Sequence, residues 1–140
     1  MVVIVGGGMV GCEVAEFLVK NGRKITILEM MPRIAGDVTR PLRFDLIMRL
    51  RKAGIQMEAD LEVTRISEYG VWGIRKKYHY GPNEDFYEAD SVVIAAGFKP
   101  PSSLAEEFAG KLSVYNIGDS SRPGNLKEAI KTAFLTAMEI

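Results

Sequence analysis

The chain has 140 residues, of which 47% are hydrophobic and 26% charged, with 18 basic and 18 acidic side chains. This length suits one packed domain with room for a partial second one, and a formal net charge of zero gives no electrostatic reason to expect nucleic acid or a membrane surface as a partner. A single cysteine and a single histidine exclude an internal disulfide and a CxxC redox pair, and they predict no metal site. The apolar start, Val2–Val5, is too short for a signal-peptide core or a membrane span, so we expect a cytoplasmic protein.

The first thirty residues predict a strand, a helix and a second strand. Val2–Val5 is continuously apolar, which is typical of a parallel strand covered on both faces. A helix is predicted over Met9–Lys20. Its apolar stripe would be formed by Val10, Val14, Phe17 and Leu18. Lys24–Glu29 follows as a strand, so the whole region is predicted to be a βαβ unit.

The middle of the chain predicts a second helix and then a change to short antiparallel strands. Thr39 serves as the N-cap of a helix that ends at Gly54, and Ile55–Glu58 is predicted to be the third parallel strand. Three β-like runs separated by turn residues, Tyr69-Gly70 and then Gly81-Pro82-Asn83, predict an antiparallel meander. These runs are Leu61–Ile66, Val71–Lys77 and Phe86–Glu88.

The last third of the chain returns to parallel structure. Ser91–Ala96 is predicted to be a buried strand that ends at Gly97, and residues 98–112 a connector. A further strand, Ser113–Ile117, leads into a helix from about Leu126 to the end. The predicted fold is therefore of the α/β class: a Rossmann-like parallel sheet with helices on both faces, plus an antiparallel β-meander.

Three glycines between the first strand and the first helix form the motif G-x-G-x-x-G. Gly6 permits a tight turn, Gly8 lets the backbone approach a diphosphate closely, and Gly11 lets the helix pack near the strand. We therefore predict that the peptide amides of this turn, including those of Met9 and Val10, cradle a diphosphate at the positive end of the helix. The alternative for the glycines is a tight βα turn that holds no ligand.

An acidic residue at the end of the second strand supports the same site. Glu29 lies 18 residues after Gly11, at the spacing where a carboxylate accepts hydrogen bonds from an adenosine ribose. This carboxylate would repel a 2′-phosphate, which favours NAD over NADP, whereas Arg33 offers a guanidinium within reach of such a phosphate. Glu13, in the first turns of the helix, is either a carboxylate favoured by the helix dipole or a group near the nicotinamide.

Other enzyme classes fit the sequence less well. A short-chain dehydrogenase would need a Tyr-x-x-x-Lys pair, and none of the five tyrosines has a lysine four residues later. A methyltransferase that uses S-adenosylmethionine also has a glycine loop and an acid after its second strand, but it does not account for ADSVVIAAG followed by YNIGD. A stand-alone module that binds NAD(H) and senses its redox state without catalysis stays open.

Four segments, in the same order, resemble the flavoprotein pyridine-nucleotide oxidoreductases, in which an NAD(P) domain is inserted into an FAD domain. VVIVGGGMVGCEVA is similar to the start of the inserted domain, and ITILEMMPRIAGDV, which contains Glu29, to its second strand and loop. ADSVVIAAGFKPPSSL, with Gly97, resembles the return to the FAD domain. VYNIGDSSRPGNLKEAIKTAFLTAMEI resembles the closing FAD motif, in which Gly118 and Asp119 would match the residues that hold the flavin's ribityl and diphosphate region.

The similarity is greatest to the C-terminal part of NADH:flavin oxidoreductases resembling 2-enoate and 2,4-dienoyl-CoA reductases, which carry FMN and an iron–sulfur cluster upstream of this part. The resemblance implies hydride transfer from NADH to FAD in a full-length parent enzyme. This chain has one glycine fingerprint, which belongs to the NAD site, and an FAD site needs another. We therefore expect a fragment that binds NAD(H), does not bind FAD and does not turn over, with no catalytic residue of its own.

The resemblance also implies domain limits. Residues 1–97 would form the NAD(H)-binding domain, residues 98–112 the connector, and residues 113–140 a strand–helix segment of an otherwise absent FAD domain. That missing domain is the expected partner of the last segment. Without it, Ser113–Ile117 would either dock beside Ser91–Ala96 as a fifth parallel strand or pair with a second copy, giving a homodimer through residues 113–140.

Overall fold

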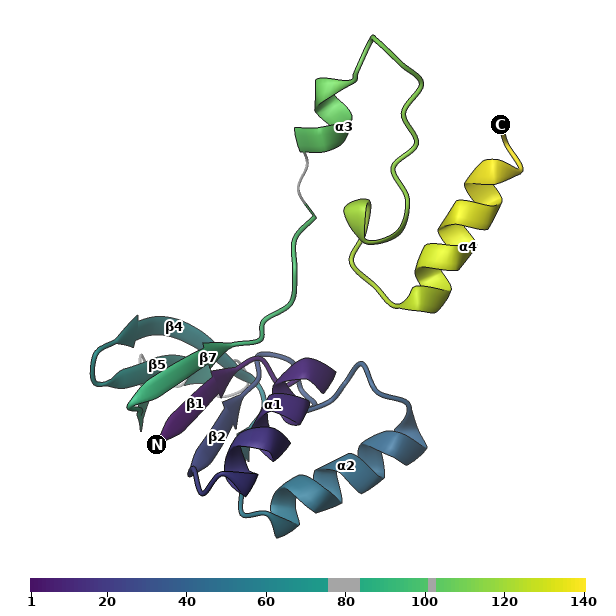
Figure 1. Cartoon of the computed structure of the whole chain (residues 1–140). Coiled ribbons are helices and arrows are strands. Elements are labelled where there is room, and N and C mark those ends of the chain that lie inside the picture. The colour runs from purple at the N-terminus through teal and green to yellow at the C-terminus, as the bar shows by residue number, and fades with distance from the viewer. Residues whose placement is uncertain (76–83, 101–102) are drawn as a thin grey trace. The chain divides into compact units, whose positions relative to one another are not determined.

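A computed structural model describes residues 1–75, 84–100 and 103–140 of the chain. These ranges form two compact units, Met1–Ala96 and Gly97–Ile140 (Figure 1). The first unit contains β1 (Val2–Val5), α1 (Met9–Lys20), β2 (Ile25–Leu28), α2 (Arg40–Lys52), β3 (Gln56–Glu58), β4 (Leu61–Ser67), β5 (Gly70–Arg75), β6 (Asp85–Glu88) and β7 (Ser91–Ile94). The second contains α3 (Ser103–Glu107), the 3-10 helix η1 (Gly118–Ser120) and α4 (Leu126–Ala137). Within the described ranges, no helix combines the length and the apolar character that crossing a bilayer requires.

A four-stranded parallel sheet in the order β3-β2-β1-β7 forms the centre of the first unit. β1 lies between its neighbours, with Val2 beside Ile25 on one side and Ser91 on the other. The residues of β2 are all buried, as are three of the four in β1, which explains why both strands are continuously apolar. The predicted Rossmann-like sheet is confirmed.

The predicted meander is confirmed as a second, antiparallel sheet in the order β4-β5-β6. The turn between β4 and β5 falls at residues 68–69, next to the predicted Tyr69-Gly70 turn. The predicted turn at Gly81-Pro82-Asn83 and the last two residues of the predicted run Val71–Lys77 lie outside the described residues.

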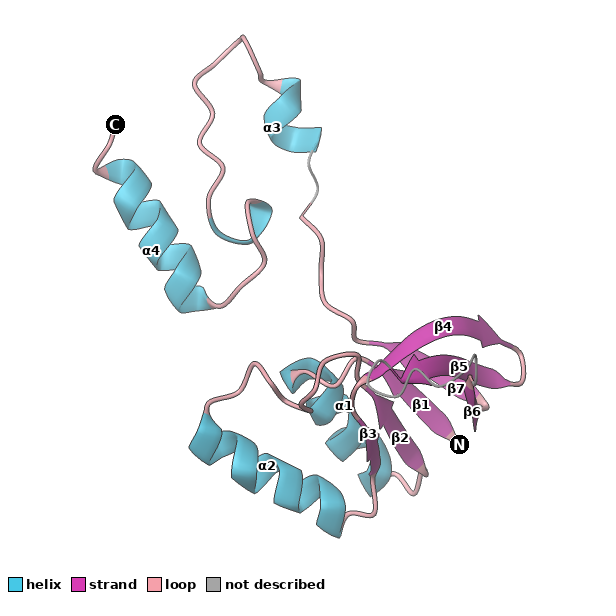
Figure 2. Ribbon diagram, turned by 180° about the vertical axis from the view of Figure 1, so that it is seen from behind, coloured by secondary structure: helices cyan, strands magenta, loops and turns pink. Residues whose placement is uncertain are grey.

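The two faces of the parallel sheet are covered differently (Figures 1 and 2). On one face, Cys12 and Ala15 of α1 and Leu50 of α2 pack with Ile4 and Ile27 of the central strands. The other face carries the alternate side chains of the same strands, and these pack with the meander. The members of this second cluster are Val3, Leu28, Leu61, Val71 and Ala89. The first unit thus differs from the expected arrangement in one respect, because the meander takes the place of a helix on the second face.

The buried stripe of α1 consists of small residues, unlike the predicted one. Gly11, Cys12 and Ala15 are buried, whereas Phe17 is 67% exposed and Val10 56% exposed. The predicted stripe is wrong at these two large residues because α1 packs too close to the sheet to accommodate them. An added Cβ at Gly11 would lie 2.0 Å from a carbonyl oxygen of the preceding turn.

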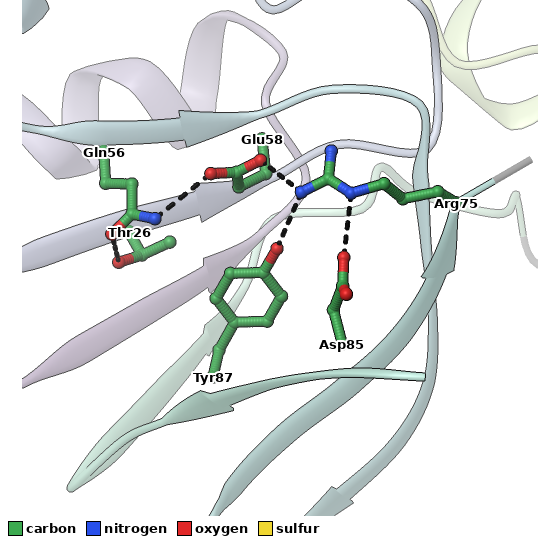
Figure 3. Close-up of polar contacts among 6 residues, drawn as sticks. All are labelled: Thr26, Gln56, Glu58, Arg75, Asp85 and Tyr87. Atoms are coloured by element: carbon green, nitrogen blue, oxygen red, sulfur yellow. Dashed lines mark hydrogen bonds and ion pairs between the residues drawn. The ribbon is translucent and has the colours of Figure 1, made fainter. Parts of the chain in front are cut away.

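Arg75, at the end of β5, joins the two sheets (Figure 3). Its Nη2 donates to the Glu58 carboxylate of β3 at 2.6 Å, and its Nε donates to Asp85 of β6 at 2.8 Å. The same Nη2 lies 3.2 Å from the hydroxyl of Tyr87. Partial burial acts to raise the pKa of Glu58, but the hydrogen bonds from Arg75 and Gln56 outweigh it and lower that pKa. This bridge fixes the meander at the edge of the parallel sheet.

In the second unit, the predicted helix near the C-terminus is confirmed as α4, but the predicted strand Ser113–Ile117 is not formed. Docking of this segment beside Ser91–Ala96 stays a prediction. A strand needs a neighbour for its backbone hydrogen bonds. At the end of this segment those bonds are made locally instead, as the Ser120 hydroxyl donates to the Ile117 carbonyl at 2.6 Å. Pairing with a second copy stays a prediction.

Candidate functional site

The glycine turn lies between the carboxyl end of β1 and the start of α1. Gly6 has a φ of +108°, and a Cβ there would lie 2.3 Å from the Ala95 carbonyl oxygen. A Cβ at Gly11 would lie 2.0 Å from the Gly6 carbonyl oxygen. Gly6 and Gly11 are therefore required by the packing of the turn and of α1, whether or not a ligand binds.

Gly8 is different, because the chain's own packing does not require a glycine there. Its φ of −70° is open to any L residue. The three atoms nearest to an added Cβ all belong to the Asp37 carboxylate, at 3.3 to 3.7 Å. Because Gly8 has no side chain, the only described side chain at the first amide of α1 is the exposed carboxylate of Asp37. Close approach of a diphosphate demands such a backbone without a side chain.

Glu29 follows β2 and directs its carboxylate to the glycine turn. The Gly7 N–H donates to Oε2 at 2.6 Å, and the Met31 N–H donates to Oε1 at 2.7 Å. The residue is only 8% exposed, and each carboxylate oxygen retains a further lone pair. Glu29 thus ties the end of β2 to the glycine turn and keeps acceptor capacity for a ligand hydroxyl. The sequence predicted the second role but gave no signal for the first.

A cavity of about 590 Å³ opens beside Glu29. Its lining residues are Gly8, Glu29, Met31, Pro32, Arg33, Gly36 and Asp37. Gly8 and Glu29, which are 21 positions apart, therefore meet at one site. Arg33 is exposed and lines the same cavity. The Glu29 carboxylate and the Arg33 guanidinium, which were predicted to influence the choice between NAD and NADP, therefore both lie at this cavity.

Asp37 is a member of this site that the sequence did not single out. Both of its carboxylate oxygens accept a hydrogen bond from the Met9 N–H, at 3.1 and 3.0 Å, so Asp37 caps the N-terminus of α1. Capping residues are normally sought directly before a helix, where this chain has Gly8. The cap instead comes from 28 positions later, and no local pattern announces it.

The other predicted residues of α1 have different surroundings. Met9 and Val10 are 40% and 56% exposed at the start of the helix. The Met9 amide is bound by Asp37, whereas within the described ranges no side chain accepts from the Val10 amide. Glu13 is exposed and does not line the cavity. Met9 is thus joined to this site through Asp37, whereas Val10 and Glu13 do not line the cavity.

Cys12 is a packing residue. It is fully buried, and its Sγ donates to the Gly7 carbonyl oxygen at 3.6 Å. Burial, followed by the nearby carboxylates of Asp37 and Glu16, raises the pKa of the thiol to about 11. A thiol that stays protonated at neutral pH is a poor nucleophile.

The remaining predicted cofactor-binding residues, Gly97, Gly118 and Asp119, belong to the second unit. Gly97 has a φ of +91° and directly follows the last residue of the first unit. Gly118 has a φ of +59°, and its N–H donates to the Thr132 hydroxyl of α4 at 3.1 Å. The Asp119 carboxylate accepts from the Gly124 N–H at 3.2 Å. Gly118 and Asp119 are thus brought together in one turn beside α4, and Gly97 is not part of it.

The donors and acceptors of the first unit fit a dinucleotide. Backbone amides at a helix start suit linked phosphates, and a buried carboxylate with free lone pairs suits a ribose. Both sets lie at the carboxyl ends of adjacent parallel strands, which is where open α/β sheets bind nucleotides. The fold is Rossmann-like, and this edge of its sheet carries the kinds of donor and acceptor that a dinucleotide would need.

Comparison with known proteins identifies the family. Residues 1–133 match the family described as pyridine nucleotide-disulphide oxidoreductase, and the chain belongs to it. It is 36% identical to an NADH oxidase of Thermoanaerobacter brockii, over 99% of this chain and 21% of that protein. It is 31% identical to a cinnamate reductase of Clostridium sporogenes, again over 99% and 21%. A solved 2-naphthoyl-CoA reductase complex matches 99% of this chain and 21% of its own, with 27% identity and a TM-score of 0.79.

The chain spans about a fifth of the length of these relatives.

Proposed function

We propose that this chain is the NAD(H)-binding part of an FAD-dependent oxidoreductase, in which NADH supplies a hydride to the flavin. The observation that carries the proposal is Gly8. A side chain at this position would need only a small shift of the exposed Asp37 carboxylate, yet the residue is a glycine that lines the cavity beside Glu29. A diphosphate held by the amides of Met9 and Val10 would require that close approach.

The proposal includes a preference for NAD over NADP. Glu29 is held by two backbone amides at 2.6 and 2.7 Å, so its carboxylate is not free to move away from the ribose corner. A 2′-phosphate placed there would meet a fixed negative charge. Arg33 is exposed and would lose side-chain entropy in any contact with a phosphate. Its attraction for a 2′-phosphate is therefore smaller than the repulsion by Glu29.

We also propose that the second unit completes an FAD-binding domain supplied by the rest of a longer protein. No side chain described between residues 105 and 140 is buried. Large apolar residues recur every four positions along α4 and are 61 to 77% exposed: Leu126, Ile130, Phe134 and Met138. Such a stripe requires a covering surface. A homodimer formed through residues 113–140 is the alternative cover.

The names and lengths of the relatives support the rest of this proposal. The NADH oxidase and the cinnamate reductase are both about five times as long as this chain. We propose that the parent is a 2-enoate-reductase-like enzyme whose further segments hold FMN and an iron–sulfur cluster, and that this chain alone does not turn over. We also propose a cytoplasmic location.

Calorimetric titration of the chain with NADH, NADPH and FAD tests the proposal. We expect one NADH site, NADPH weaker by about tenfold or more because of the fixed carboxylate, and no binding of FAD. Gly8→Ala should weaken NADH binding by about tenfold or more, since the added methyl group occupies the approach to the amides.

Gly124→Ala is the matched control, because a Cβ there meets no atom closer than 3.5 Å and this glycine has no left-handed φ. Tighter binding of NADPH than of NADH would overturn the argument from Glu29. Stoichiometric FAD binding would overturn the assignment of the second unit, and unchanged NADH binding by Gly8→Ala would overturn the assignment of the glycine turn.

A further inference from the structure

Asp37 occupies an amide that the proposed ligand needs. Its Oδ1 and Oδ2 lie 3.1 and 3.0 Å from the Met9 nitrogen, at the positive end of α1. The same carboxylate is the nearest group to the position of a Cβ on Gly8, the glycine that gives access to this helix end. The two carboxylate oxygens therefore stand where two phosphate oxygens of a bound dinucleotide would be expected.

The backbone of the loop that carries Asp37 is fastened to its surroundings. The Ala35 N–H donates to the Gly7 carbonyl oxygen at 2.6 Å, and Ala35 itself is fully buried. The Arg43 Nε donates to the Ile34 carbonyl oxygen at 2.7 Å. Asp37, in contrast, is exposed, so its side chain can rotate away from α1 while the rest of the loop stays in place.

We propose that Asp37 is an affinity-determining residue whose carboxylate competes with the diphosphate of the ligand for the start of α1. This inference rests on the proposed function of the site. A diphosphate that binds Met9 must break the bond to Asp37 and then remain near its negative charge, and both effects weaken binding. An adenosine-containing ligand without a diphosphate reaches Glu29 without meeting this competition. Asp37 therefore lowers the affinity for ligands that contain a diphosphate and does not lower the affinity for a nucleoside.

The test compares Asp37→Asn with the wild-type chain and with Asp45→Asn. Asparagine keeps an oxygen that can accept from the Met9 N–H but removes the charge, so the cap of α1 is retained. Asp45 is an exposed carboxylate of α2 that pairs with Arg49, and its substitution changes the net charge equally. Dissociation constants for NADH, ADP-ribose and adenosine are measured by calorimetry or by NMR titration.

We expect Asp37→Asn to bind NADH and ADP-ribose about tenfold more tightly, as the loss of a like charge at a few ångströms implies. Adenosine should change by less than about twofold. Asp45→Asn should leave all three affinities within that range, because Asp45 pairs with Arg49 and does not line the cavity. Asp37→Ser, which can also cap the helix, replaces the asparagine variant if the latter does not fold.

Equal or weaker NADH binding by Asp37→Asn would overturn the proposal, and so would equal tightening for adenosine, which would indicate a change in the loop as a whole. If neither the wild-type chain nor the variants bind NADH, the proposed function of the site fails. If all of them bind NADH equally, only the role of Asp37 fails.

Discussion

The two units of this chain differ in how completely they cover their apolar surface. In Met1–Ala96, the parallel sheet has helices on one face and a meander on the other, and residues such as Ile4 and Ile27 are fully buried. In Gly97–Ile140, α4 exposes its apolar stripe. Phe134, for example, is 63% exposed. A sheet covered on both faces can be a complete folding unit at this size, whereas a lone helix cannot bury its apolar side.

The same division separates the two groups of predicted site residues. Gly8 and Glu29 are positioned by buried strands and by hydrogen bonds from distant parts of the chain. Gly118 and Asp119 are positioned by a local turn, through bonds to Thr132 and Gly124. We therefore expect the first site to be preorganised for its ligand in this chain. The second depends on a surface that would cover α4.

The largest expected difference between the units is at two glycines with positive φ. Gly6→Ala should destabilise the first unit by about 3 kcal/mol or more, because its Cβ would meet a backbone oxygen at 2.3 Å. Gly97→Ala has nothing within 4 Å of its Cβ and should leave the first unit unchanged to within about 0.5 kcal/mol. Urea unfolding followed by the fluorescence of Trp72, the single tryptophan, reports on the first unit. Equal destabilisation by Gly6→Ala and Gly97→Ala would contradict the distinction between the units.

Truncation of one large apolar side chain in each unit should give the next largest difference. Leu50→Ala should lower the free energy of unfolding by about 2–5 kcal/mol, because Leu50 is fully buried. Phe134→Ala, at a residue 63% exposed, should change it by less than about 0.5 kcal/mol. Urea titration by far-UV circular dichroism measures both. A large loss for Phe134→Ala would show that α4 is covered in solution, by the homodimer or otherwise.

A change of pH is expected to have a smaller effect on the free energy of unfolding. This effect arises from Cys12, in the first unit. Burial first, and neighbouring carboxylates next, raise the pKa of Cys12 from 9.0 to about 11. Below pH 9 the thiol is protonated in both the folded and the unfolded chain, so its contribution is constant. Between pH 9 and about 11 only the unfolded chain loses the proton, so stability falls as pH rises, by up to about 2–3 kcal/mol.

Unfolding of the wild type and of Cys12→Ala at pH 7, 9 and 10.5 isolates this contribution. The difference in stability between the two proteins should shrink as pH rises through this window. A difference that stays constant would mean that the thiol is not shielded from solvent.

The smallest expected effect concerns the bridge between the two sheets. Arg75→Gln should destabilise the first unit by about 1 kcal/mol, because Glu58 and Asp85 lose their shared cation while remaining partly exposed to water. Arg49→Gln breaks exposed pairs with Glu16 and Asp45 instead and should destabilise the unit less than Arg75→Gln does. Thermal unfolding of both variants ranks them, and the reverse order would contradict the bridging role of Arg75.

Much of the first unit could be predicted from sequence because its signals are local. The continuously apolar strands β1 and β2 and the spacing of Gly6, Gly8 and Gly11 mark the βαβ unit directly. The buried stripe of α1 could not be predicted, since it is set by how closely the helix approaches the sheet, which admits Cys12 but not Phe17.

The parts that the sequence did not reveal depend on contacts between distant residues. The capping of Met9 by Asp37 and the bond from Gly7 to Glu29 span 28 and 22 positions, so no local pattern predicts them. The strand expected at Ser113–Ile117 failed for a related reason. Its β-prone residues are a local signal, but a strand also needs a neighbouring strand, and the described residues of the second unit include none.

The most direct test of the central claim is an NMR titration of the ¹⁵N-labelled chain with NADH. The proposed site predicts that the largest saturable shift changes occur at the amides of Gly8, Met9 and Val10, with smaller changes at Met31, next to the Glu29 carboxylate. Residues 113–140 should change little. Shift changes concentrated in residues 113–140, or none that saturate in the glycine turn, would contradict the assignment of this turn as the NAD(H) site.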